Sequence, residues 1–183
     1  MKTVFLDRDG VINDDTGYVG SWDEFYFLPG VIEALKILTE KGFNIIIVTN
    51  QSGIARGYYS EDEYFRLERK ITEYLKAKGV FITATYYCPH LIRGLVKTYS
   101  IDCDCRKPSP GMLVQAAKEH NLDFSQAIMI GDKATDMEAA HSVDIPERYF
   151  IDLSMSADEK SYELSTERFE SLFDSVKFLT RAS

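Results

Sequence analysis

The stretch that decides the fold is residues 4–10, which read Val4-Phe5-Leu6-Asp7-Arg8-Asp9-Gly10. An apolar run long enough for one buried strand stops at two aspartates one residue apart, and a glycine behind them lets the backbone turn. Ligands of an open parallel sheet bind in the crevice beyond the carboxyl ends of its strands. Carboxylates at that position would face a site, whereas the competing interpretation is a polar turn after an edge strand.

Paired aspartates also begin the calcium-binding loop of an EF-hand, but the spacing here excludes that motif. Counted from Asp7, Val11 stands at a ligand position, Ile12 at the position of the glycine, and Tyr18 at that of the bidentate glutamate. The two aspartates therefore need partners from elsewhere in the chain.

The composition is that of an ordinary soluble protein, with 45% hydrophobic and 27% charged residues among 183. A chain of this length buries roughly 70% of its unfolded surface as one unit, so we expect residues 1–183 to form a single domain. No apolar run approaches the roughly 18 residues of a membrane span, and Met1-Lys2-Thr3 leads into the first strand without the apolar region of a signal peptide. We expect a cytoplasmic monomer with no membrane partner.

The charge balance argues against a nucleic-acid partner. A formal net charge of −8 offers no basic surface to a polyanion. Any phosphate ligand must therefore be held by a few local cations.

Predicted strands and helices alternate along the chain. Helical spacing of apolar residues, a capping box at Ser60 and Glu63, and terminating glycines predict helices over about residues 31–41, 60–78, 110–120, 137–143 and 169–178. Apolar runs predict strands over residues 4–6, 43–48, 81–87, 127–130 and 149–151, and residues 91–102 are expected to form a loop. This alternation predicts an α/β fold, a three-layer Rossmann-like arrangement with a mostly parallel central sheet.

The spacing of the polar segments predicts an open site. Neither the interval from Asp9 to Thr49 nor that from Thr49 to Lys107 can hold an independent cap domain. Only loops can then cover the site, so a bulky substrate should be able to enter.

Polar residues gather at three predicted strand ends and in one loop. They are Asp7 with Asp9, Thr49 to Ser52, Asp132 with Lys133 and Asp136, and Arg106-Lys107 before Pro108. Together they supply carboxylates for a divalent cation such as Mg²⁺, one carboxylate for covalent chemistry, and hydroxyl, amide and cationic groups for phosphate oxygens. These are the functional groups that phosphoryl transfer through an aspartyl phosphate requires. Taken singly, Lys107 could be a surface lysine, Asp132 a helix N-cap and Thr49 a strand-end hydroxyl.

These four segments resemble the motifs of the haloacid dehalogenase superfamily of phosphatases, namely Asp7-Arg8-Asp9-Gly10, Thr49-Asn50, Lys107-Pro108 and Gly131-Asp132 with Asp136. The resemblance implies that Asp7 is the nucleophile and Asp9 the general acid and base. It places Mg²⁺ on the Asp7 carboxylate, the Asp9 backbone carbonyl and the Asp132 carboxylate. Thr49 and Lys107 would hold the transferring phosphoryl group, supported by Asp136. Because Asp9 must carry a proton before it expels an alkoxide, we expect its pKa to lie above the usual value of about 3.9.

A second signal comes from the cysteines and one histidine. Cys88 and His90, followed after twelve intervening residues by Cys103 and Cys105, supply four soft ligands that suit tetrahedral Zn²⁺. Four protein ligands leave no position for water, so this zinc would be structural, in a loop over residues 88–105 that is inserted before Arg106-Lys107. The alternative is three buried thiols beside a surface histidine.

Within the superfamily, the zinc loop and the lack of a cap resemble the histidinol-phosphate phosphatases and, more closely, the heptose bisphosphate phosphatases. The latter likeness rests on Gly17-Tyr18-Val19, residues 49–57, residues 86–90, residues 103–108 and residues 110–113. It implies a small phosphorylated sugar as substrate, touched by Asp15, Thr16, Gly17, Tyr18, Asn50, Gln51, Ser52, Arg106 and Lys133. Arg106 is the candidate for a second, non-reacting phosphate, because its fork can bind phosphate bidentately.

Three functional hypotheses follow. The first is a Mg²⁺-dependent phosphatase acting on a sugar phosphate, and the second is an enzyme of the same kind acting on histidinol phosphate or another small monoester. The third belongs to a different class, a zinc-loop binding module on a phosphatase scaffold that recognises a ligand without turnover. The intact carboxylates at Asp7, Asp9 and Asp132 favour an enzyme.

Overall fold

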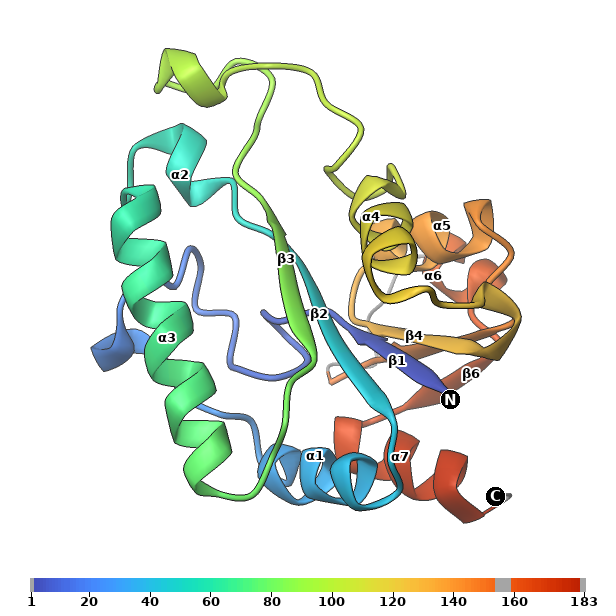
Figure 1. The fold of residues 1–183 in the computed structure, drawn as a ribbon. Coiled ribbons are helices and arrows are strands. Elements are labelled where there is room, and N and C mark those ends of the chain that lie inside the picture. Colours follow the sequence, from blue (N-terminus) through green and yellow to red (C-terminus); the bar gives the residue numbers. More distant parts are fainter. Residues whose placement is uncertain (1, 154–158, 182–183) are drawn as a thin grey trace.

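The computed structural model describes residues 2–153 and 159–181, which form a parallel sheet between two layers of helices (Figure 1). The strands are β1 (Thr3–Leu6), β2 (Asn44–Asn50), β3 (Ala84–Cys88), β4 (Ala127–Gly131), β5 (Glu147–Ile151) and β6 (Glu167–Phe169). The helices are α1 (Val31–Glu40), α2 (Gly53–Arg56), α3 (Glu61–Ala77), α4 (Gly111–His120), α5 (Ala134–Ser142), α6 (Glu159–Leu164) and α7 (Leu172–Arg181). Short 3-10 turns lie at Trp22–Glu24, Lys97–Tyr99 and Phe124–Gln126.

The sheet has the order β3-β2-β1-β4-β5-β6, and every neighbouring pair is parallel. The direction in which the chain adds strands therefore reverses beside β1, which pairs with both β2 and β4. In open α/β sheets this reversal point is where a crevice forms beyond the carboxyl ends of the strands. The segment that follows Leu6 starts at that crevice.

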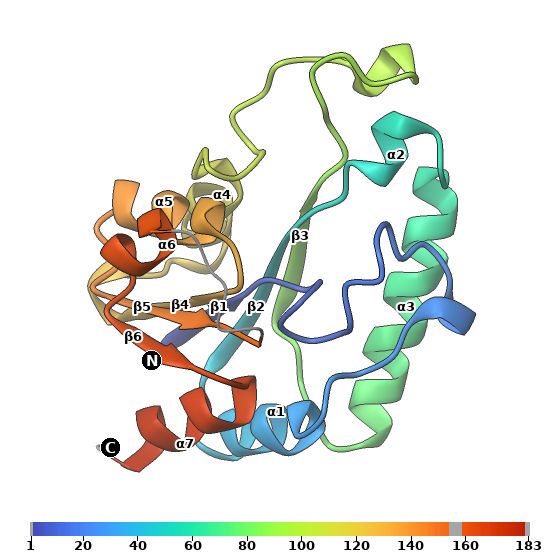
Figure 2. The same cartoon turned by 180° about the vertical axis from the view of Figure 1, so that it is seen from behind.

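The two faces of the sheet bury different helices, as the alternation of side chains along a strand requires. Val4 and Leu6 belong to one core with residues of α1, α3 and α7. Phe5 belongs to the other core, with residues of α4 and α5. Figure 2 shows α1 and α7 on one side of the sheet and α4, α5 and α6 on the other. The predicted three-layer α/β fold is confirmed.

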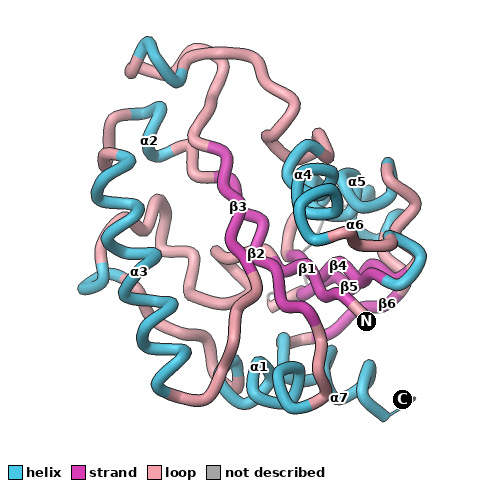
Figure 3. The backbone as a smooth tube through the Cα atoms, in the orientation of Figure 1, coloured by secondary structure: helices cyan, strands magenta, loops and turns pink. Residues whose placement is uncertain are grey.

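The long connections lie where ligands are expected. Figure 3 draws the segment after β1 and the segment between β3 and α4 largely as loops. The latter segment carries His90, Cys103 and Cys105, while Cys88 ends β3. No second sheet or helical domain covers these loops within residues 2–153 and 159–181. The same residues contain no helix that is both long and apolar enough to cross a membrane.

Several predicted elements were wrong in their bounds, including the helix predicted over residues 137–143, which is Ala134–Ser142. The third strand is Ala84–Cys88 instead of residues 81–87, because Phe81 is 61% exposed and the pairing with β2 extends to Cys88. The terminal helix starts at Leu172, while Phe169 ends the short strand β6. The rings of Phe169 and Phe178 nevertheless pack with centroids 5.3 Å apart. Apolar residues of β6 and α7 thus pack in one cluster. In the sequence their spacing resembles the apolar stripe of a single helix, which is why one helix was predicted.

Candidate active site

Three carboxylates converge beyond the ends of β1 and β4. Asp7 follows β1, Asp132 follows β4, and Asp136 lies in the first turn of α5. One oxygen from each lies within 4.8 Å of the others. Because β1 and β4 pair in parallel, with Leu6 opposite Ile130, their following residues must meet at the same edge.

Two glycines make this approach possible. Gly10 has φ +89°, and a Cβ atom there would overlap the Asp132 carboxylate. A Cβ at Gly131 would overlap the side chain of Asp136. Glycine at both positions is therefore a steric requirement of the carboxylate cluster, in addition to the backbone freedom that Gly10 uses.

The cluster has the negative charge and the unpaired oxygen that suit a site for a divalent cation. Burial and the negative charge of Asp136 raise the pKa of Asp7 to about 6. Burial and the charges of Asp7 and Asp136 raise the pKa of Asp132 to about 8. Asp132 Oδ1 is buried without a hydrogen-bond partner among the described residues. A hard cation such as Mg²⁺ would satisfy that oxygen and relieve the repulsion, so the residues fit the ion.

Lys107 supplies a cation at the centre of the cluster. Its Nζ lies 3.0 Å from Asp7 Oδ1 and 2.6 Å from Asp136 Oδ1, and it donates to the Val48 carbonyl at 2.7 Å. The side chain is only 2% exposed. Burial lowers the pKa of Lys107, but the two carboxylates more than offset this and raise it. Lys107 therefore stays charged beside the predicted nucleophile.

Asn50 fixes the loop that carries this lysine. Its Nδ2 donates to the Lys107 carbonyl at 3.0 Å, and its Oδ1 accepts from the Lys107 backbone N–H at 3.1 Å. Both ends of the amide are thus used by the backbone at Lys107. The Asn50 side chain, which was expected to touch substrate, also joins the end of β2 to the cationic loop.

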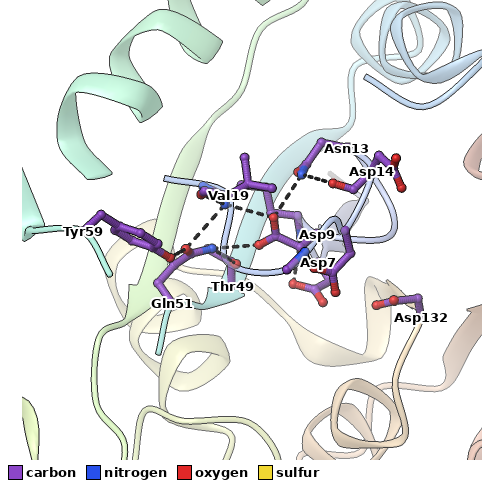
Figure 4. A network of polar contacts seen from close by, with 12 residues as sticks. Asp7, Asp9, Asn13, Asp14, Val19, Thr49, Gln51, Tyr59 and Asp132 are labelled. Carbon is purple, nitrogen blue, oxygen red and sulfur yellow. Dashed lines mark hydrogen bonds and ion pairs between the residues drawn. The ribbon is translucent and has the colours of Figure 1, made fainter. Parts of the chain in front are cut away.

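Asp9 is held by three side chains (Figure 4). Its Oδ1 accepts from Arg8 at 2.9 Å and from Asn13 at 3.0 Å, and its Oδ2 accepts from Gln51 Nε2 at 2.9 Å. Burial would raise the pKa of Asp9, but the buried Arg8 guanidinium and these hydrogen bonds hold it below its ordinary value. The expectation of a raised pKa was therefore wrong for the free protein, because the adjacent arginine turns inward and pairs with Asp9.

A cavity of about 420 Å³ opens over Asp9 and Lys107. Ten of its lining residues were predicted as site residues: Asp9, Asp15, Gly17, Tyr18, Asn50, Gln51, Ser52, Arg106, Lys107 and Lys133. Thr16 is exposed and does not line it. Tyr59 and Thr135 line the cavity without having been predicted. No periodicity or motif marks either residue, since only the folded chain brings the segment after α2 and the start of α5 to this edge.

An ion pair closes one side of the cavity. Lys133 Nζ lies 3.0 Å from Asp15 Oδ2 and 3.8 Å from Asp132 Oδ2. Asp15 belongs to the loop after β1, whereas Lys133 follows β4. The side chains are 49% and 36% exposed, so the pair can open to a polar ligand at little cost.

The cysteines and the histidine form a second cluster. Sulfur atoms of Cys88, Cys103 and Cys105 lie 3.1 to 3.6 Å apart, and His90 Nδ1 lies 3.3 Å from Cys105 Sγ. All three cysteines are free thiols. Tetrahedral zinc with bonds of about 2.3 Å separates sulfur ligands by about 3.8 Å, so the donors lie slightly inside the positions that this ion requires.

The second cluster is attached to the cavity. Arg106 directly follows the last cysteine, and its Nη1 donates to the His90 carbonyl at 3.3 Å. Gly111 N donates to the Asp104 carbonyl at 2.9 Å, and a Cβ at Gly111 would overlap that carbonyl. The loop is therefore packed against the start of α4, with Arg106 directed to the cavity that it lines.

The chain is similar in sequence to a family of hydrolases and to curated phosphatases. The model of the haloacid dehalogenase-like hydrolases matches residues 6–144. D-glycero-beta-D-manno-heptose-1,7-bisphosphate 7-phosphatase of Pasteurella multocida is 43% identical over 178 residues, which cover 97% of this chain and 96% of that protein. D-glycero-alpha-D-manno-heptose-1,7-bisphosphate 7-phosphatase of Photorhabdus laumondii is 44% identical over 151 residues, which cover 82% of this chain and 82% of that protein.

A solved structure agrees over the whole chain. The crystal structure of D,D-heptose 1,7-bisphosphate phosphatase from B. bronchiseptica, complexed with magnesium and phosphate, has a TM-score of 0.86 and 28% sequence identity. The similarity covers 100% of both chains. The resemblance of the four motifs is thus confirmed by sequence and by fold, and the chain belongs to the haloacid dehalogenase-like hydrolases.

Proposed function

We propose that this protein is a Mg²⁺-dependent phosphoric monoester hydrolase that removes the 7-phosphate of D-glycero-D-manno-heptose 1,7-bisphosphate through an aspartyl phosphate. The observation that carries the proposal is the Asp7 carboxylate, paired with Lys107 and crowded by Asp132 beside a cavity lined by cations. Relatives of nearly equal length carry the name of this activity.

Asp7 is the proposed nucleophile because one of its oxygens is already fixed. Asp7 Oδ1 accepts from the Arg8 backbone N–H at 2.8 Å and contacts Lys107 Nζ at 3.0 Å. This leaves the second oxygen to attack phosphorus while the bond from phosphorus to the sugar oxygen breaks. Lys107 and Thr49 then hold the charged phosphoryl oxygens. Mg²⁺ on Asp7, the Asp9 carbonyl and Asp132 would neutralise further charge on the phosphoryl group.

Asp9 is the proposed proton carrier. It donates a proton to the departing sugar oxygen, and later takes one from the water that attacks the aspartyl phosphate and regenerates Asp7. The free carboxyl is held ionised by Arg8. A phosphate that binds nearby adds negative charge, which favours the protonated acid that the first step requires.

The cavity is proposed to hold the sugar and its second phosphate. Asp15, Thr16, Gly17 and Tyr18 would contact the sugar from the loop after β1, with Ser52 and Lys133 beside them, and Asn50 and Gln51 would support the site. Arg106, which lines the cavity beside Lys107, would bind the non-reacting phosphate, because a guanidinium can bind phosphate bidentately.

The cysteines and His90 are proposed to bind a structural Zn²⁺. All four ligand positions are occupied by protein, so the ion would support the loop and take no part in the chemistry. The support comes from four donors within 4.8 Å and from the Arg106 bond to His90. Cys105→Ser should lose stoichiometric zinc in elemental analysis and raise KM for the bisphosphate; a variant that keeps a full complement of zinc would contradict the assignment.

The activity is tested by phosphate release from both anomers of the heptose bisphosphate and from histidinol phosphate, with Mg²⁺ or with EDTA. Wild-type protein should prefer the heptose and need Mg²⁺, and Asp7→Asn should lose at least about a thousandfold in kcat. Acid-quenched wild type should carry phosphate on the peptide that contains Asp7. A preference for histidinol phosphate would overturn the substrate, and wild-type turnover by Asp7→Asn would overturn the mechanism. A single domain, a monomeric state and a cytoplasmic location complete the proposal.

A further inference from the structure

Gln51 has no hydrogen-bonding capacity left for a substrate. Its Nε2 donates to Asp9 Oδ2 at 2.9 Å and to Thr49 Oγ1 at 2.8 Å, which uses both amide hydrogens. Its Oε1 accepts from the Tyr59 hydroxyl at 2.6 Å and from Arg8 Nη2 at 3.4 Å, which uses both lone pairs. The side chain is a buried link between two groups of the reaction, Thr49 and Asp9, and a residue outside the four motifs, Tyr59 (Figure 4).

Tyr59 has a fixed orientation. Tyr59 is 8% exposed, and its ring lies between Gly20, in the loop after β1, and Gly53, which begins α2. A Cβ at Gly20 would overlap the edge of the ring near the backbone, and a Cβ at Gly53 would overlap the edge beside the hydroxyl. The two glycines thus form a slot that holds the ring and aims its O–H at Gln51.

The direction of the amide depends on that hydroxyl. An amide can rotate by half a turn about its last bond and exchange its oxygen with its nitrogen. A rotated Gln51 would point its oxygen at the Asp9 carboxylate, so that two acceptors would face each other. The Tyr59 O–H needs an acceptor at the other end of the amide, whereas Arg8 Nη2 already has Asp9 Oδ1 and the Val19 carbonyl as closer acceptors. Tyr59 therefore selects the orientation in which Nε2 faces Asp9.

We infer that Tyr59 is a positioning residue for proton transfer, which acts through Gln51 to hold the Asp9 carboxylate in line with the leaving oxygen. The inference rests on the proposed role of Asp9. Tyr59 lines the cavity, but its hydroxyl is already donated to Gln51. Its contribution should therefore appear in the protonation of the leaving group.

Tyr59→Phe tests the inference, because it keeps the ring in its slot and removes only the hydroxyl. For the heptose bisphosphate, whose alkoxide needs a proton, kcat/KM should fall about five- to twentyfold. For p-nitrophenyl phosphate, whose leaving group needs no proton, kcat/KM should change less than about twofold. Tyr86→Phe is the matched control, since it removes a bond of the same 2.6 Å length to Glu119, away from the cavity, and both rates should be unchanged.

A double-mutant cycle with Gln51→Leu tests whether the two residues act in series. Tyr59→Phe should cost nothing further once Gln51→Leu is present, because the link to Asp9 is already broken. Additive losses, an equal loss for both substrates, or an unchanged Tyr59→Phe variant would overturn the inference. These results leave the phosphatase itself intact as long as Asp7→Asn is inactive. A wild-type protein that hydrolyses no alkyl phosphate would instead refute the proposed function, and the inference with it.

Discussion

Asp132→Asn should make the metal-free protein more stable while it removes the response to Mg²⁺. Asp132 has an oxygen within 4.8 Å of oxygens of Asp7 and Asp136, and its own Oδ1 has no hydrogen-bond partner among the described residues. When no cation is bound, the Asp132 carboxylate is therefore destabilised by repulsion from the other two carboxylates. An amide of the same shape removes the charge without removing a hydrogen bond from that oxygen.

The size of the effect follows from the distance. Two unit charges 4.8 Å apart repel by about 3 kcal/mol at an effective dielectric constant of about 20. The ion pair of Asp132 with the half-exposed Lys133, at 3.8 Å, opposes this by at most about 1 kcal/mol. The variant should therefore gain about 2 kcal/mol in free energy of unfolding, or about 4 to 8 °C in Tm for a chain of this size.

The gain should depend on pH with a definite sign. The pKa of Asp132 is raised from 3.8 to about 8 in the folded protein, so folding takes up a proton between these values. The stability of metal-free wild type then falls as the pH rises from about 4 to about 8. Asparagine does not titrate, so the advantage of the variant should be small near pH 4 and largest at about pH 8.

Thermal unfolding in EDTA and in Mg²⁺ measures both effects. Mg²⁺ should raise Tm of wild type through binding to the folded state and leave Tm of Asp132→Asn unchanged. Asp62→Asn, at an exposed position in the first turn of α3, makes the same charge change and should alter stability by no more than about 0.5 kcal/mol. The reasoning is refuted if Asp132→Asn in EDTA is less stable than wild type at about pH 8, or if Mg²⁺ stabilises both proteins equally.

Two further substitutions test residues that hold Lys107 and Asp132 in position. Asn50→Ala should lower kcat about tenfold, because it leaves both backbone groups of Lys107 without their partner; steady-state kinetics should show no such loss for Asn44→Ala, at the other end of β2. Gly10→Ala should abolish the Mg²⁺-dependent rise in Tm and destabilise the protein by about 2 to 3 kcal/mol, because its methyl group overlaps Asp132 at φ +89°. Gly42→Ala also has a positive φ, +73°, but no atom lies near the added methyl, so it should cost only about 1 kcal/mol and keep the Mg²⁺ response. Equal effects of the two glycine substitutions would show that backbone strain alone explains the loss.

The sequence by itself determined where the chemistry lies. Polar residues at the ends of apolar runs had to meet at one edge of a parallel sheet, and the structure brings Asp7, Lys107, Asp132 and Asp136 together there. The cluster of Cys88, His90, Cys103 and Cys105 was equally predictable, because four soft donors in two close pairs have few other uses in a chain with three cysteines. Spacing along the chain is sufficient when the ligands are near in sequence or each marks the end of a strand.

Only the tertiary structure decided how individual side chains are used. Arg8 is next to Asp9 in sequence, but its inward turn and the resulting fall in the pKa of Asp9 depend on burial among distant elements. Gln51 was predicted to touch substrate, yet the hydrogen bonds of its amide are made to other residues of the protein, which are Thr49, Asp9, Tyr59 and Arg8. Hydrogen-bond direction and burial arise from contacts across the fold, because an amide or a guanidinium has several possible partners and packing alone selects among them.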